Sequence, residues 1–124
     1  HYQAMLITDA AVFYSRLTKW DEHFFGLPVH TIQSQLYFQL GFEPLRSPEY
    51  NSQFTVDISE QLETKLASIL CYATQFPPEK RGILNRVRGL AISAGAAAGF
   101  EAGEVFSTTR PLGCRDLVQT VLCN

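Results

Sequence analysis

The stretch that decides the fold is RVRGLAISAGAAAGFEAGEVF, residues 86–106. Its small side chains and the closing Gly99 predict a helix over about 79–98 with a glycine C-cap. Gly89 and Gly95 would each cost such a helix roughly 1 kcal/mol relative to alanine. We therefore expect the helix to press its backbone against a neighbouring element. The residues after it, 104–109, predict a strand.

The segment before this helix predicts a strand followed by a second helix. Residues 54–57 form a short β-prone run, and Asp57 and Glu60 stand three apart, as in a capping box. The helix that follows is expected to stop before Pro77. Its apolar side carries Leu62, Leu66, Ile69, Leu70 and Ala73.

The first third of the chain predicts one helix, one loop and one strand. Apolar residues recur every three or four positions over 4–17, which is typical of a helix with one buried face. Residues 20–30 combine aromatics with Gly26 and Pro28, so we expect a loop packed by its own side chains and bordering a pocket. Residues 35–40 are typical of a strand.

Composition limits the function classes. The chain has 124 residues, 46% hydrophobic residues and a formal net charge of −2, which fits a folded protein of one domain at most and gives no electrostatic reason to bind nucleic acid. Its longest apolar run, residues 90–100, is about half of the roughly 20 residues that a membrane span needs. Three cysteines without C-x-x-C spacing favour reduced thiols and a cytoplasmic protein.

Four blocks in order carry a family resemblance: DAAV at 9–12 after an N-terminal histidine, VDI at 56–58 before a helix with Lys65, YATQ at 72–75, and residues 86–106 with GFEAGEVF. Together they resemble the later half of the PIG-L or LmbE-like zinc-dependent N-deacetylases. The resemblance covers almost the whole chain. The family includes deacetylases of N-acetylglucosaminyl-phosphatidylinositol and of mycothiol and bacillithiol synthesis.

The resemblance implies an α/β fold, a Rossmann-like three-layer αβα arrangement of which residues 1–124 are the C-terminal portion, with mixed short strands and two long helices. It implies a metal-dependent amide hydrolase that uses one zinc ion to remove an N-acetyl group from an N-acetylglucosamine-type amino sugar or conjugate. In the family, an early Ala-His-Pro-Asp-Asp-Glu motif supplies two ligands and the general base. We expect that motif in a missing N-terminal half of the same protein, so the chain alone should be inactive.

His1 is the one metal candidate. The family's later His-Pro-Asp-His motif supplies the third zinc ligand and a histidine that stabilises the oxyanion. We align His1 with the last histidine of that motif, because aligning it with the first would put Ala4 at a ligand position. Whether His1 is the ligand or the oxyanion histidine stays open, and the catalytic residues are unknown. Three N and O ligands leave zinc a fourth position for a water whose pKa falls toward 7.

Other polar residues suit structural roles. Glu104 is expected to anchor a loop or a helix N-terminus, and it would not pair with Glu101, because residues three apart on a strand face opposite ways. Arg81 and Arg88, seven apart on one helical face, could meet substrate or a neighbouring subunit. No role is assigned to His23 and His30. Thr74-Gln75 matches a Ser-Gln pair of the family, but its role stays open between that match and a polar helix C-terminus.

Two further interpretations stay open. One is a non-catalytic Rossmann-like module that has lost its metal site and serves binding or oligomerisation. The other is a self-contained α+β interaction domain whose likeness to the family is accidental. The expected partners of the enzyme are a small N-acetylated amino sugar and the preceding half of the domain, and the small-residue helix is compatible with a homo-oligomer.

Overall fold

The computed structural model describes residues 2–20, 22–38 and 52–122. The chain divides into two compact units, His1–Gln35 and Leu36–Asn124. No helix among these residues has the length and apolarity that a bilayer crossing requires.

The first unit is built on helix α1, Tyr2–Tyr14, which confirms the predicted helix and shifts it two residues toward the N-terminus. The chain returns along α1: the His30 N–H donates to the Ser15 carbonyl at 2.8 Å, and Gln35 Nε2 donates to Asp9 Oδ1 at 2.6 Å. Contrary to the prediction of one buried face, no residue of α1 is buried. Asp9 is the one charged residue of α1, and apolar side chains surround the helix instead of forming a single stripe.

The loop after α1 is packed by its own aromatic side chains, as predicted. Trp20 stacks on Tyr14 with ring centroids 5.0 Å apart and also lies against the rings of His23 and Phe24. A tight turn follows, in which Phe25 and Gly26 both have positive φ, 54° and 73°. Phe25 stands at its tip, 93% exposed.

The second unit holds three strands: β1 (Leu36–Phe38), β2 (Ser52–Asp57) and β3 (Gly103–Thr108). Their order is β1-β3-β2, and β3 is antiparallel to both neighbours. The predicted strands at 54–57 and 104–109 are confirmed to within two residues.

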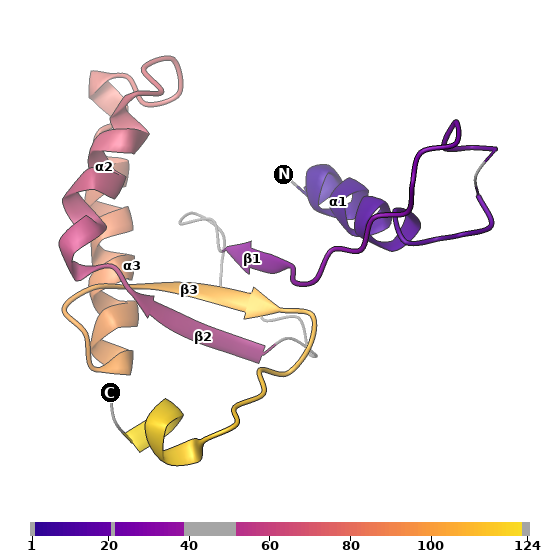
Figure 1. Cartoon of the computed structure of the whole chain (residues 1–124). Helices are drawn as coiled ribbons and strands as arrows, with labels where there is room; N and C mark the ends of the chain where they lie inside the picture. Colours follow the sequence, from indigo (N-terminus) through magenta and orange to yellow (C-terminus); the bar gives the residue numbers. More distant parts are fainter. Residues whose placement is uncertain (1, 21, 39–51, 123–124) are drawn as a thin grey trace. The chain divides into compact units, whose positions relative to one another are not determined.

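Two helices connect β2 to β3 (Figure 1). A 3-10 turn, Ser59–Gln61, leads into α2, Leu62–Leu70, and a second one, Pro78–Lys80, precedes α3, Gly82–Ala98. Helix α2 ends at Leu70, earlier than the predicted end just before Pro77, because the N–H groups of Cys71 and Tyr72 bond to the carbonyls only three residues back, those of Ser68 and Ile69. After β3, a short π-helix spans Val118–Leu122.

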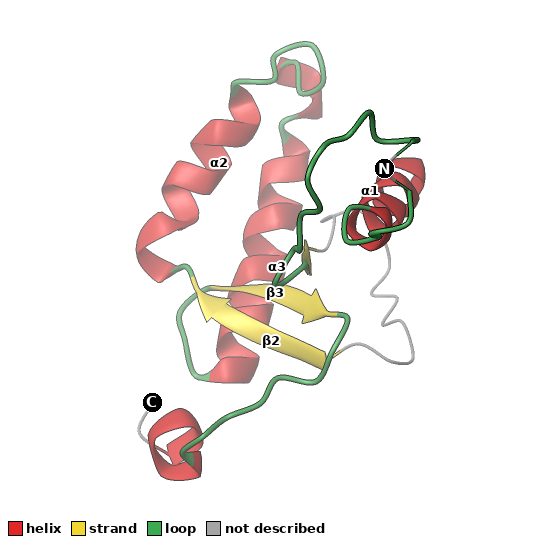
Figure 2. Cartoon of the chain, turned by 45° about the vertical axis from the view of Figure 1, so that its right-hand side comes forward, coloured by secondary structure: helices red, strands yellow, loops and turns green. Residues whose placement is uncertain are grey.

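Helix α3 lies along one face of the sheet, as Figure 2 shows, and its backbone approaches that of the segment leading into β3. A Cβ placed on Gly95 would come within 2.6 Å of the Ala102 backbone, and one on Gly103 would come within 2.9 Å of the Gly95 nitrogen. Gly99 is the C-cap of α3 at φ 85°, where glycine is favoured. The predicted close approach and the predicted cap are both confirmed.

A small core joins α2, α3 and the turn before β3. Its buried members are Ile58, Leu62, Leu66, Ala91 and Ala102, with Leu84 and Val87 packed against them. The second unit is therefore a mixed α and β structure with a three-stranded antiparallel sheet.

Candidate functional site

The predicted metal ligand, His1, lies outside the described residues. Within residues 2–20, 22–38 and 52–122, no group of three or more His, Cys, Asp or Glu side chains is placed to hold a metal ion.

The two other histidines belong to the first unit. His23 packs against Trp20, with ring centroids 5.1 Å apart. Because Trp20 stacks on Tyr14, the last residue of α1, the aromatic loop packs at the C-terminal end of that helix, about twelve residues or roughly 18 Å from its start at Tyr2. The structure thus associates this loop with the C-terminal end of α1.

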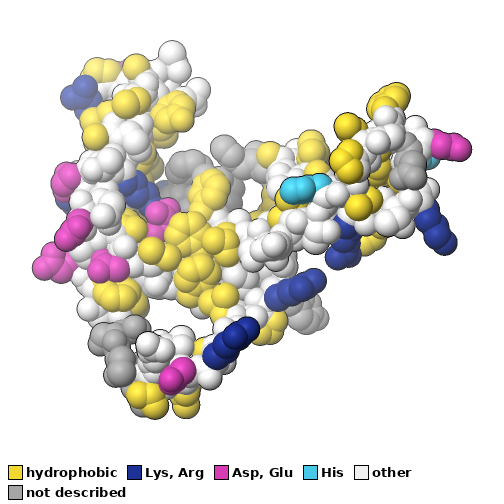
Figure 3. Space-filling view, in the orientation of Figure 1, with side chains coloured by type: hydrophobic (Ala, Val, Ile, Leu, Met, Phe, Trp, Pro, Cys, Tyr) yellow, Lys and Arg dark blue, Asp and Glu magenta, His cyan; other side chains and the backbone are white. Residues whose placement is uncertain are grey.

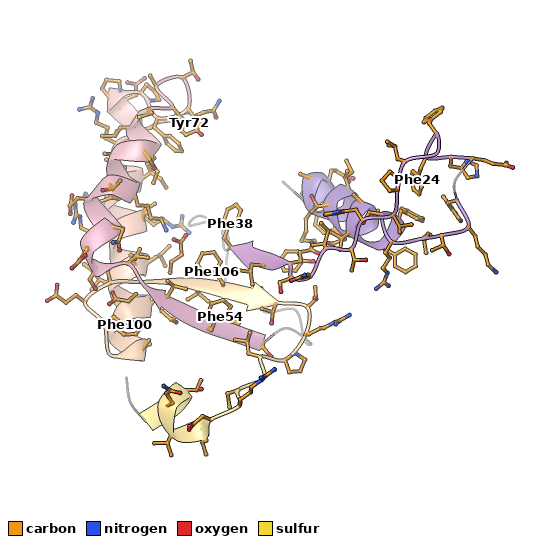
Figure 4. All side chains as sticks on the ribbon, in the orientation of Figure 1. Phe24, Phe38, Phe54, Tyr72, Phe100 and Phe106 are labelled. Atoms are coloured by element: carbon orange, nitrogen blue, oxygen red, sulfur yellow. The ribbon has the colours of Figure 1, made fainter. Side chains whose placement is uncertain are left out.

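The most prominent surface of the second unit is an apolar sheet face. Phe38, Phe106 and Phe54 stand at one register position across all three strands, and the rings of Phe54 and Phe106 stack 5.9 Å apart. Figure 4 shows the three labelled rings on the same side of the sheet. We call this surface the aromatic face; it consists of Leu36, Phe38, Phe54, Val56 and Phe106.

The sheet carries its three phenylalanines on the face away from α3. The face toward α3 presents Gly103, Val105 and Ser107 of β3, and Tyr37 of β1 shares their side. On the opposite face, Phe38 is 62% exposed and Leu36 54%. Figure 3 shows hydrophobic side chains gathered over the middle of the second unit. An open sheet face ordinarily carries the polar residues of the alternation.

An ion pair borders the aromatic face. Lys65 Nζ of α2 lies 2.7 Å from Oε1 of Glu104, two residues before Phe106 on the same side of β3. Both side chains are partly buried. Glu104 thus anchors the beginning of α2, in agreement with the predicted structural role, while Glu101 lies in the turn before β3 rather than on the strand.

A second ion pair joins the two helices. Both Nη atoms of Arg88 donate to the carboxylate of Glu63, the Nη2–Oε2 distance being 2.9 Å. These hydrogen bonds lower the pKa of Glu63 and raise that of Arg88. Arg81 lies in the turn before α3, so it does not share a helical face with Arg88 as the spacing had predicted. Through this ion pair with Glu63, Arg88 links α3 to α2.

The loop between β2 and α2 is closed by Asp57. Its Oδ1 accepts hydrogen bonds from the Ser59 hydroxyl at 2.5 Å and from the Ser59 N–H at 2.9 Å. These bonds, the hydroxyl's above all, lower the pKa of Asp57. The Ser59 hydroxyl also accepts from the Ala102 N–H at 3.2 Å, tying this loop to the turn before β3. The predicted capping box of Asp57 and Glu60 is wrong: Asp57 closes a turn with Ser59, and neither the 3-10 turn at Ser59–Gln61 nor α2 has a side-chain N-cap hydrogen bond.

Sequence reasoning missed the aromatic face, although it identified all three strands that form it. The signal was present: Phe54 and Val56 alternate on β2 while Gln53 and Thr55 occupy the other side. The row of rings needs the pairing of β3 with both neighbours, which no single segment encodes. No family model matches the chain.

Proposed function

We propose that the chain is the C-terminal part of a zinc-dependent N-deacetylase domain of the PIG-L or LmbE-like kind. Its substrate would be a small N-acetylated amino sugar or its conjugate, hydrolysed in the cytoplasm. A preceding half of the domain would supply the remaining ligands and the general base, and the complete domain would have the Rossmann-like three-layer arrangement.

The observation that carries the proposal is how the blocks of the resemblance meet. Lys65, from the block after β2, pairs with Glu104, from the final block. Asp57 and Ala102, from those same two blocks, are joined through the Ser59 hydroxyl. Blocks distant in sequence thus share specific contacts, which supports the proposal that they belong to one domain.

His1 is the residue of this chain that would bind zinc. Bound zinc would activate a water molecule and polarise the acetamide carbonyl. The residues of the second unit would support the site structurally: the partly buried pair of Lys65 and Glu104 fixes α2 against β3.

The test uses the longer polypeptide that contains these residues, purified without chelators. We expect about one zinc ion per chain, as a single-site family implies, and release of a primary amine from N-acetylglucosamine conjugates. A His1→Ala variant should lose at least about tenfold in zinc affinity or activity, the usual loss for disturbing a metal site. His30→Ala is the matched control and should retain both.

Two results would contradict the enzyme. Absence of bound zinc together with absence of amine release would favour the non-catalytic module. Equal behaviour of the His1→Ala and His30→Ala variants would remove His1 from the site even if the polypeptide hydrolyses the substrate.

A further inference from the structure

We draw no further inference here: the strongest candidate, the aromatic face on the side of the β1-β3-β2 sheet away from α3, carries no proposal because nothing in the structure shows what covers it.

Discussion

Gly95 lies at the closest approach between α3 and the turn before β3. The space for a Cβ at this position is taken by the nitrogen, Cα and carbonyl carbon of Ala102 at 2.6–2.7 Å. Backbone atoms cannot rotate away as a side-chain tip can, so any larger residue must push the helix off the sheet. The role of this glycine is therefore steric, and the helix tolerates its conformational cost in exchange for close packing.

We expect Gly95→Ala to destabilise the protein by about 1–3 kcal/mol or more, the usual cost of overpacking, despite the better helix propensity of alanine. Gly89→Ala is the matched control in the same helix, because a Cβ there meets nothing within 4 Å. That variant should gain up to roughly 1 kcal/mol. Chemical denaturation of both variants measures the difference, and equal effects of the two substitutions would contradict the steric role.

The local sequence predicts some of the structural roles of single residues and not others. The cap at Gly99 and the hydrogen bonds of Asp57 to Ser59 follow from local chemistry, since each acts within a few residues. The partners of Glu104 and Arg88 could not be deduced in this way, because Lys65 and Glu63 lie 39 and 25 residues away and meet them only once α2 packs beside α3 and β3. Phe25 was no more predictable, since a bulky residue at positive φ goes against its own preference.

At the scale of elements, the loop from β2 to α2 depends on an ionised carboxylate. Asp57 accepts two hydrogen bonds from Ser59 in the folded protein, and its pKa is lowered there. The unfolded chain, with an ordinary aspartate, binds more protons in acid. The contribution of this loop to stability is therefore fully present above about pH 5 and is lost as the pH falls through 4 and below.

Asp57→Asn is expected to remove this part of the pH dependence. The difference in the free energy of unfolding between wild type and variant should be largest near neutral pH and should shrink at about pH 3, where the aspartate of the unfolded chain is largely protonated. Denaturation midpoints at both pH values measure it. A Glu60→Gln variant is the control, and a wild-type advantage over Asp57→Asn that stays constant down to pH 3 would show that the carboxylate plays no such part.

Elements were more predictable than their arrangement. The helix of small residues, its glycine cap and the strand after it follow from residues 86–106, and the structure confirms all three. The order β1-β3-β2 could not be read from the sequence, because β1 and β2 are each paired to a strand more than 45 residues later. The aromatic face exists only through that pairing, so it escaped prediction together with the order.

At the scale of the whole chain, the two units differ in how they are stabilised. The second unit has a buried cluster that includes Leu62, Leu66 and Ala102, while none of the residues of α1 in the first unit is buried. Helices of about 13 residues are marginal in water without packing. The stability of the 124-residue chain is therefore expected to be concentrated in the second unit.

Amide hydrogen exchange of the 124-residue chain should show this division. Amides of β3 and of the middle of α3, around Ala91 and Gly95, are expected to exchange at the rate of global unfolding. Amides of α1 should exchange at least about a hundredfold faster, through local opening. Comparable protection in both units would show that α1 is held by packing that its own unit does not provide.

The row of phenylalanines also helps to fix the register of β3 against β1 and β2. Sliding β3 by one residue against its neighbours would turn Phe106 toward α3, where Gly95 and Gly103 leave no room for a ring. A misaligned sheet would thus be unable to close against its helix. Because one face carries the rings and the other is closed by the close approach of Gly95 and Gly103, a single register of β3 is compatible with the packed sheet.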